Sequence, residues 1–330
     1  MGEFELIERF FKQPATGCVA LGIGDDCALL RPAPGMELAV SSDMLVEGRH
    51  FFADVDPAAL GHKALAVNLS DLAACGAEPL AFTLALALPP EGARDESWLT
   101  AFAGGLRALA GAHGCPLAGG DTTAGPLNIC ITVLGQVPVG QALRRDGARA
   151  GDELWVSGTL GDARLALLAL RGEIALAPAQ LAAARQRLER PTPRLALGRA
   201  LRGIATSCID LSDGLAGDVG HILKASGVGA WIDAGAACGL IAANVLPASR
   251  EEGVFDLDFR RRAVLTGGDD YELAFTAPAA ARPLVLAAAR ASATPVTRIG
   301  GITAGAGLTV VDAQGRTLPA GPFASFDHFR

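Results

Sequence analysis

The stretch Ser207-Cys208-Ile209-Asp210-Leu211-Ser212-Asp213-Gly214-Leu215 joins a short apolar run to the start of an amphipathic run. Its pattern predicts a strand at 206–210 that leads into a helix at 213–226, with aspartates at the junction. Apolar runs and helical periods alternate in this way along the whole chain. Such alternation favours an α/β or mixed α/β fold. With 330 residues the chain is long enough for two domains.

A polar stretch rich in arginine and glycine, 140–151, is the best candidate for a domain boundary. We therefore expect an N-terminal domain at 1–139 and a C-terminal domain at 140–330. In the first domain the patterns predict helices at 3–11, 56–75 and 95–112, and strands at 38–42, 80–88 and 127–137. In the second they predict strands at 153–157, 206–210, 228–233 and 271–276, helices at 162–171, 179–202, 213–226, 256–264 and 280–291, and short closing strands.

Composition excludes several classes of function. The net charge is −7, and no basic stripe or aromatic platform indicates a nucleic-acid partner. The apolar runs, such as 80–88, are far too short to span a membrane. The acidic start, 1–5, lacks the basic region of a signal peptide. The seven cysteines form no C-x-x-C pair, as is typical of reduced thiols in a cytoplasmic protein.

The strongest chemical signal is a set of aspartates that end apolar runs or lie inside glycine-rich segments. Gathered carboxylates repel each other and lose solvation, so they need a compensating cation. Oxygen ligands without Cys/His clusters favour Mg²⁺. We therefore expect several Mg²⁺ ions that clamp a polyphosphate. The segments are 24–26 (Gly-Asp-Asp), 41–43 (Ser-Ser-Asp), 68–71 (Asn-Leu-Ser-Asp), 119–123 (Gly-Gly-Asp-Thr-Thr), 210–213 (Asp-Leu-Ser-Asp) and 267–270 (Gly-Gly-Asp-Asp).

Each motif also has a structural explanation when it is taken alone. The two Gly-Gly-Asp segments are compatible with ordinary turns, and Ser212 or Asp213 could cap the following helix. Asp71 differs, because it lies in an apolar helical run where an unpaired core-facing carboxylate would be costly. A ligand role explains Asp71 better. The chain has no G-x-x-x-x-G-K-[ST] loop and no G-x-G-x-x-G opening a βαβ unit, so any nucleotide is bound by another device.

Six segments, in order, resemble the thiamine-monophosphate kinase family. They are 22–28 (Gly-Ile-Gly-Asp-Asp-Cys-Ala), 41–43, 63–74 (Lys-Ala-Leu-Ala-Val-Asn-Leu-Ser-Asp-Leu-Ala-Ala), 119–123, 209–215 (Ile-Asp-Leu-Ser-Asp-Gly-Leu) and 267–273 (Gly-Gly-Asp-Asp-Tyr-Glu-Leu). The resemblance extends from about Phe4 to the end of the chain. It implies an ATP-binding superfamily shared with aminoimidazole ribonucleotide synthetase and selenophosphate synthetase. It also implies a homodimer formed through the N-terminal sheet, with a C-terminal domain that completes the cleft.

The same resemblance assigns roles to individual residues. It implies that Gly120, Asp121, Arg145 and Ser212 contact ATP, and that His50, Asp269 and Phe326 contact thiamine monophosphate. The magnesium ligands that it implies are Asp26, Ser41, Ser42, Asp43, Asp71, Asp121, Asp210 and Asp213. Two residues depart from the family pattern: Asp269 stands where glutamate is common, and Phe326 stands where tryptophan or tyrosine is common. Without the resemblance, Arg145 could be a solvated loop arginine, His50 a polar turn residue and Phe326 a packing residue.

The implied reaction moves the γ-phosphoryl group of ATP directly onto the phosphate of thiamine monophosphate and gives thiamine diphosphate and ADP. We expect no catalytic general base, because the acceptor phosphate is already anionic near pH 7. Two alternatives remain open from the residues alone. One is another ATP-using enzyme of the same superfamily, and the other is a non-catalytic sensor of nucleotides or divalent metals.

Overall fold

The computed structural model describes residues 2–24, 27–92, 95–242, 256–312 and 314–318. The chain divides into two compact units. The first comprises Met1–Leu72 and Ala77–Gly140, and the second comprises Ala73–Gly76 and Gln141–Arg330. Two predicted site residues, Asp26 and Phe326, lie outside the described residues. Among those described, no helix is both long and apolar enough to cross a bilayer.

The first unit is built on a four-stranded sheet. Its order is β3 (Met36–Val46), β6 (Asn128–Pro138), β4 (Glu78–Leu88) and β5 (Leu117–Ala124). Neighbouring strands are antiparallel except β4 and β5, which are parallel. The predicted strands at 38–42, 80–88 and 127–137 are confirmed; β3 and β4 are longer than expected, and β6 is shifted by one residue.

The glycine-rich segment 119–123 does not form the turn that we considered. It lies inside β5, where Gly120 pairs with Leu84 of β4. Gly120 has φ +149°, and a Cβ at this position would lie 1.9 Å from the Leu84 carbonyl oxygen. The glycine is therefore needed because two backbones approach closely, and a turn is not the reason for it.

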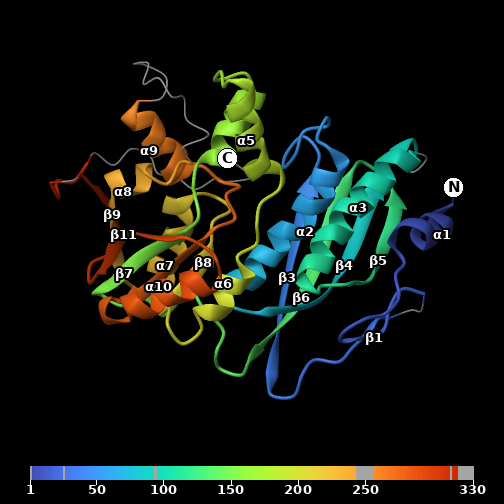
Figure 1. Ribbon diagram of the computed structural model, residues 1–330, viewed down its shortest axis with the longest axis horizontal. Coiled ribbons are helices and arrows are strands. Elements are labelled where there is room, and N and C mark those ends of the chain that lie inside the picture. Colours follow the sequence, from blue (N-terminus) through green and yellow to red (C-terminus); the bar gives the residue numbers. More distant parts are fainter. Residues whose placement is uncertain (1, 25–26, 93–94, 243–255, 313, 319–330) are drawn as a thin grey trace. The chain divides into compact units, whose positions relative to one another are not determined.

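Two helices, α2 (Pro57–Ala74) and α3 (Glu96–His113), cover one face of this sheet (Figure 1). Both begin at a capping aspartate and end before a glycine in the left-handed region. The Asp56 carboxylate accepts hydrogen bonds from the amides of residues 58 and 59, and Gly76 has φ +65°. Asp95 and Gly114 perform the same roles for α3. The predicted starts and ends of both helices are confirmed.

The N-terminal segment folds as α1 (Glu3–Leu6) and the π-helical η1 (Ile7–Phe11), followed by the short strands β1 (Val19–Leu21) and β2 (Leu29–Leu30). Phe11 of η1 meets Phe102 of α3 edge-to-face, and Arg9 forms an ion pair with Glu96. The β1–β2 hairpin packs on Ala81 and Ala118 at one corner of the sheet. The N-terminal segment thus lies beside the edge strand β5.

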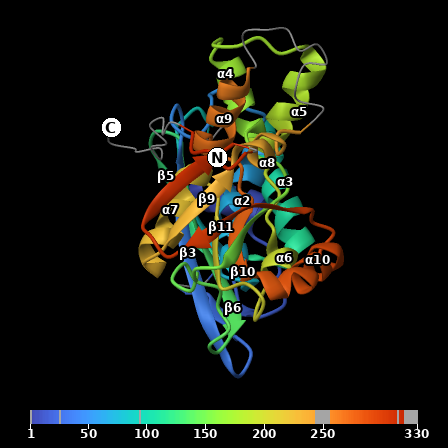
Figure 2. The same ribbon diagram turned by 90° about the vertical axis from the view of Figure 1, so that its left-hand side faces the viewer.

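The second unit contains a six-stranded sheet with the order β12-β9-β11-β7-β10-β8. Figure 2 labels β9, β10 and β11 of this sheet. The parallel pair is β9 with β12, and the other pairs are antiparallel. The strands are β7 (Asp152–Ser157), β8 (Ser207–Asp210), β9 (Gly229–Asp233), β10 (Leu273–Pro278), β11 (Val296–Thr303) and β12 (Gly307–Val311). Each strand lies where the sequence predicts one, so the mixed α/β class is confirmed in both units.

The helices of the second unit follow the predicted segments, except for the short α8 (Ala234–Cys238), which was not predicted. The range 179–202 contains two helices, since Pro191 and Pro193 interrupt it. Leu154, Val156 and Ala274 of the sheet belong to the main core of this unit. On the opposite face Trp155 stacks on Phe275. The helices are α4 (Asp162–Leu170), α5 (Pro178–Glu189), α6 (Leu195–Ala200), α7 (Leu215–Ser226), α8 (Ala234–Cys238), α9 (Leu257–Thr266) and α10 (Arg282–Ala291), with a 3₁₀ turn, η3 (Ala279–Ala281).

Candidate functional site

In the first unit a strand and a helix bring together two predicted ligands. The Ser41 hydroxyl on β3 donates a hydrogen bond to the Asp71 carboxylate on α2, with 2.5 Å between the oxygens. Asp71 was expected to face the core, and this is wrong: it is partly exposed, while Leu69 and Leu72 beside it are buried. Its carboxylate therefore lies at the boundary of the core, where a ligand can reach it.

The neighbouring aspartate of β3 is held through its backbone. The Asp43 amide donates to the side-chain oxygen of Asn68, 3.1 Å away, and the Asn68 NH₂ group donates to the Ala64 carbonyl. Asn68 is fully buried in α2. This buried amide fixes the edge strand against the helix at Asp43. The sequence motif alone does not indicate this role of Asn68.

Strand alternation divides the other predicted ligands of this unit between two faces. Ser41 and Asp43 share the helix-covered face, because residues two apart on a strand point the same way. The Ser42 hydroxyl instead lies 3.0 Å from that of Thr132 on the opposite face. Asp121 pairs with Ala85, which pairs with Cys130, and the Cys130 sulfur is 3.6 Å from the Ser42 hydroxyl. Cross-strand partners share a face, so Asp121 and Ser42 lie on the same one.

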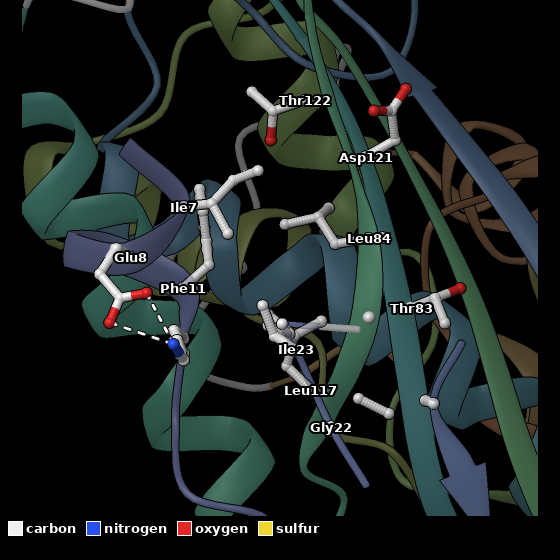
Figure 3. A pocket seen from close by; sticks show the side chains of 16 residues that line it. Ile7, Glu8, Phe11, Gly22, Ile23, Thr83, Leu84, Leu117, Asp121 and Thr122 are labelled. Atoms are coloured by element: carbon white, nitrogen blue, oxygen red, sulfur yellow. Dashed lines mark hydrogen bonds and ion pairs between the residues drawn. The ribbon is translucent and has the colours of Figure 1, made fainter. Parts of the chain in front are cut away.

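A cavity of about 720 Å³ opens beside β5, next to the predicted nucleotide contacts. Figure 3 shows Ile7 and Phe11 of η1 on one side of it and Leu84 of β4 on the other, and Asp121 and Thr122 of β5 also line it. Its wall is mixed, because apolar side chains meet the exposed backbone of 119–121. At η1 the Lys12 ammonium forms an ion pair with Glu8 at 2.8 Å. The cavity therefore combines an apolar surface with one cation, Lys12, and two carboxylates, Glu8 and Asp121.

His50 lies in a closed turn between β3 and α2. The Val46 amide donates to His50 Nδ1 at 3.0 Å. Because Nδ1 accepts this bond, the imidazole proton resides on Nε2. Lys63 of α2 is buried, and its ammonium donates to the His50 carbonyl at 3.3 Å. The turn thus holds His50 as a neutral Nε2–H donor. We had not predicted a role for Lys63, although it is one of three lysines among 28 basic residues.

In the second unit the Asp210–Gly214 segment follows β8 directly. Asp210 is buried at the end of the strand. Neither Ser212 nor Asp213 is the cap of α7, as we had considered; the N-cap is Gly214. The buried Asp218 carboxylate instead accepts the amides of Asp213 and Gly214 at 3.0 and 3.1 Å. Burial, together with the neighbouring charge of Asp213, raises the pKa of Asp218 to about 7.

The second Gly-Gly-Asp segment lies against this one. The Asp269 amide donates to the Ser212 carbonyl at 2.9 Å, and the Tyr271 amide donates to the Leu211 carbonyl at 2.8 Å. A Cβ on Gly268 would lie 2.3 Å from the Ser212 carbonyl oxygen. The glycine is required for this close approach. Ser212, predicted to contact ATP, and Asp269, predicted to contact the other substrate, are therefore joined by a backbone hydrogen bond.

Arg145 lies on an exposed loop whose backbone is anchored by Ser226. The Ser226 hydroxyl donates to the Arg145 carbonyl at 2.9 Å and accepts the Ala148 amide at 3.1 Å. A Cβ on Gly147 would lie 1.9 Å from the Thr206 carbonyl oxygen, so the loop sits tightly on that segment. The backbone of Arg145 is held, while its side chain is exposed to solvent.

Among the described residues no three His, Cys, Asp or Glu side chains gather closely enough to hold a metal ion by themselves. The predicted ligands belong to both units: Ser41, Ser42, Asp43, Asp71 and Asp121 to the first, and Asp210 and Asp213 to the second. Every one of them offers oxygen, the donor that Mg²⁺ prefers. The donor set fits Mg²⁺ in its chemistry, with substrate phosphates and water as the remaining ligands.

The chain is similar throughout its length to proteins of known class. Residues 24–137 match the family model "AIR synthase related protein, N-terminal domain", and 149–313 match the corresponding C-terminal domain. The thiamine-monophosphate kinases of Escherichia coli (strain K12) and Salmonella typhimurium are 45% and 46% identical to it; the matches cover 99% and 92% of this chain and 98% and 91% of those proteins.

Solved structures give the same result. The crystal structure of thiamine-monophosphate kinase from Stenotrophomonas maltophilia is 46% identical, with a TM-score of 0.80 and coverage of 91% of this chain and 92% of that one. The structure of AaThiL complexed with AMPPCP and TMP is 29% identical, with a TM-score of 0.75 and coverage of 91% and 89%. These similarities confirm the resemblance that the ordered motifs indicate.

Proposed function

Because this chain belongs to the thiamine-monophosphate kinase family, we propose that it transfers the γ-phosphoryl group of ATP directly to the phosphate of thiamine monophosphate. The products are thiamine diphosphate and ADP. The observation that carries the proposal is the identity of about 45% with curated kinases of this name over nearly the whole chain. Both segments that the motifs single out for phosphate contacts, 119–123 and 210–214, belong to the matched ranges.

The chemistry requires charge neutralisation more than proton transfer. The acceptor phosphate has a second pKa of roughly 6 and is a dianion at neutral pH, so no general base has to activate it. Two unit charges ~4 Å apart repel by about 4 kcal/mol at an effective dielectric constant of 20. Several such charges meet when ATP approaches a second phosphate. The principal task of the residues is therefore to hold and neutralise two phosphate groups in line.

We propose that the carboxylates provide this through bound Mg²⁺. Asp71, Asp43 and Asp121 would hold the ions from the first unit, and Asp210 and Asp213 from the second, with Ser41, Ser42 and Asp26 completing the set. A bound Mg²⁺ ion would supply positive charge that neutralises the phosphate groups. The Ser41–Asp71 hydrogen bond supports the assignment, because it orients the Asp71 carboxylate before any ion arrives. Backbone contacts hold Asp43 and Asp121 on their strands.

We place the nucleoside part of ATP in the cavity beside β5. Its apolar wall, formed by side chains such as Ile7, Phe11 and Leu84, suits an aromatic base. The cavity borders Gly120 and Asp121, which the motif assigns to the nucleotide, and Gly120 leaves its backbone open to a phosphate. Arg145 and Ser212 would contact the same nucleotide from the second unit.

For the phosphorylated acceptor we propose His50, Asp269 and Phe326. The neutral Nε2–H of His50 is a hydrogen-bond donor to a phosphate oxygen, and the geometry of its turn keeps the donor on that nitrogen. The Asp269 carboxylate suits the cationic thiazolium ring of the substrate, as does the aromatic face of Phe326. Phe326 lies outside the described residues, so its assignment depends on the motif alone.

We also propose a homodimer formed through the open face of the first sheet. On β3, Leu38, Val40 and Met44 alternate on this face and are 55%, 61% and 53% exposed. Three exposed large apolar side chains on one face of one strand are unusual for a surface that stays in water. A second copy of the chain would bury them. The polar residues Ser42 and Thr132 between them would limit the size of this apolar patch.

Product analysis tests the proposed function directly. The purified protein is incubated with ATP, Mg²⁺ and thiamine monophosphate, and the products are quantified by mass spectrometry. Equal amounts of thiamine diphosphate and ADP are expected. If ATP is consumed only with other phosphorylated acceptors, the proposed substrate is wrong, while an ATP-using enzyme of the same superfamily remains consistent with the result. Nucleotide binding without turnover would favour the sensor.

A further inference from the structure

The segment that precedes β10 adopts an unusual backbone conformation. Asp269 has φ +66° and Tyr271 has φ +50°, both in the left-handed region. This region is uncommon for residues other than glycine, and it is least favourable for bulky side chains such as tyrosine. Two such residues within three positions persist only where the surroundings hold them. The surroundings of this segment therefore determine where the Asp269 carboxylate lies.

Alternate residues of the segment are anchored on two different sides. The amides of Asp269 and Tyr271 donate to the Asp210–Gly214 segment, as described above. The side chain of Asp270, which lies between them, is anchored to the loop that follows β7, and that of Glu272 to Ser157 at the end of β7 and to two arginines. Both Asp270 oxygens accept the Gly161 amide, at 3.1 and 3.0 Å. Burial raises the pKa of Asp270 well above its ordinary value, and the nearby Asp162 and Glu272 charges add to this.

Glu272 is the most strongly bound of these anchors. It is fully buried and accepts hydrogen bonds from Ser157 Oγ at 2.5 Å, from Arg187 Nη2 at 2.7 Å and from Arg194 Nε at 2.6 Å. Arg194 Nη2 makes a second contact, so this pair is bidentate. The same Ser157 hydroxyl accepts the Leu273 amide at 2.8 Å. One buried carboxylate thus joins β7, α5 and the segment before α6.

The loop beside Glu272 is shaped to admit this carboxylate. Gly158 has φ +57°, and a Cβ at this position would lie 2.1 Å from Glu272 Oε1. No side chain other than hydrogen fits there while Glu272 keeps its two arginine partners. Burying a carboxylate together with two arginines costs desolvation free energy, so the cluster contributes little net stability to the fold. Fixing one conformation of a functional segment is a better reason for its presence.

We propose that Glu272, clamped by Arg187 and Arg194, is a positioning residue that holds Asp269 in its left-handed conformation and so sets the affinity for the phosphorylated acceptor. This role rests on the proposed function, in which Asp269 contacts that substrate. Glu272 itself is fully buried and presents no surface to a substrate. It acts through the peptide chain, three residues from the carboxylate that it positions.

The test compares two buried glutamates of the same unit. Glu272→Gln keeps the shape and removes the charge. Arg194→Met is a milder variant, because Glu272 keeps Arg187 and the charges stay balanced. The control is Glu153→Gln on β7, where a buried glutamate is bound by Arg282 on the surface of the unit. Hydrogen exchange of the peptide covering 268–273 is measured in the full-length protein, together with kcat and with KM for each substrate.

In the Glu272 and Arg194 variants we expect at least tenfold faster exchange in this peptide and at least a tenfold higher KM for thiamine monophosphate. The kcat and the KM for ATP should stay within threefold. Glu153→Gln should change neither exchange there nor KM by more than twofold. In an Asp269→Ala background, Glu272→Gln should raise the KM for thiamine monophosphate by less than a further twofold, because the residue through which Glu272 acts is gone.

Two results would overturn the proposal: unchanged exchange at 268–273 in both variants, or an equal rise in KM with and without Asp269. If Glu272→Gln does not fold, Arg194→Met decides the question. If the wild-type protein makes no thiamine diphosphate, the proposed function is wrong, and this result is independent of the role of Glu272 in holding the segment. The exchange data then still show whether Glu272 holds the segment, and unchanged exchange would refute that as well.

Discussion

The hydroxyl of Ser41 donates to the carboxylate of Asp71 across 2.5 Å, and this bond links a strand of the first sheet to the helix that covers it. The bond constrains how Asp71 can act. One of its oxygens is directed toward β3 and the carboxylate remains partly exposed. Asp71 is therefore held in place while it can still accept a further ligand.

Replacing Asp71 by asparagine should abolish most activity without unfolding the protein. Asparagine can still accept the Ser41 hydroxyl, so only the charge is lost, and we expect kcat to fall at least 100-fold with little change in melting temperature. The matched control on the same helix is Asp56→Ala. It removes the cap of α2 and should cost about 1 kcal/mol of stability while leaving kcat unchanged. Near-wild-type turnover of the Asp71 variant at saturating Mg²⁺ would refute its ligand role.

Two adjacent glycines of β5 should respond very differently to alanine. Gly120→Ala would place a Cβ 1.9 Å from the Leu84 carbonyl oxygen, so β5 must separate from β4. We expect the KM for ATP to rise at least tenfold and the melting temperature to fall. At Gly119 the nearest atom to the new Cβ is a methyl carbon of Thr83 at 3.9 Å, an ordinary contact. Gly119→Ala should therefore change the KM for ATP by less than twofold and leave the melting temperature nearly unchanged. Similar losses in the two variants would contradict the pairing of β4 with β5.

Stability should depend on pH through Asp218. Its pKa is about 7 in the folded chain, above the ordinary value of about 3.9, so the folded state binds the proton more tightly than the unfolded state. Between about pH 4 and pH 7 the free energy of unfolding should therefore fall as pH rises, by up to about 4 kcal/mol in total. Asp162 and Asp270 are shifted in the same direction and should add to the trend.

Thermal melts of the protein without metal and nucleotide, from pH 5 to pH 8, measure this trend. Asp218→Asn should flatten it, since an amide can accept the same backbone hydrogens without titrating. Asp95→Asn is the control, because hydrogen bonds from Ser97 and the Trp98 amide lower the pKa of Asp95. That variant should keep the slope of the wild type over this range. A slope that persists in Asp218→Asn would assign the titration to other groups.

The fixed tautomer of His50 leads to a further expectation. A neutral N–H donor can be replaced by the amide of glutamine, so His50→Gln should keep the KM for thiamine monophosphate within about fivefold. His50→Leu removes the donor and should raise KM by about ten- to a hundredfold, the usual effect of losing one hydrogen bond to a charged group. Steady-state kinetics at pH 8 measure both. If the two variants are equally impaired, His50 does not serve as a donor.

Much of the fold follows from local sequence. Asp56 and Gly76 mark the two ends of α2 because capping and left-handed termination depend on residues close in the chain. The strands around 80–88 and 271–276 are readable because continuous apolar runs bounded by turns have few alternatives. β5 was missed because Gly-Gly-Asp has the composition of a turn. Its pairing with Leu84, more than thirty residues away, is a tertiary contact that no local pattern contains.

For the candidate site, too, the sequence indicates some residues and not others. Aspartates in glycine-rich segments are visible in the sequence, and the ordered motifs identify them. The groups that hold them are not visible in this way. Asn68, Asp218 and Glu272 act through partners that are distant in sequence or through backbone amides, and only the fold supplies these partners. For Glu272 one signal existed: it is the single acidic residue of the predicted strand at 271–276, where an unpaired charge would be costly.

The alternation along β3 restricts how this chain can evolve. Ser41 and Asp43 serve one face of the sheet, and Leu38, Val40 and Met44 form the other. Inserting or deleting a single residue within the strand would exchange the two sets, moving aspartate to the apolar surface and leucine toward the predicted ligands. Natural variants of β3 should therefore change length at its ends or by two residues at a time. Selection on the residues of one face thus also preserves which residues lie on the other face.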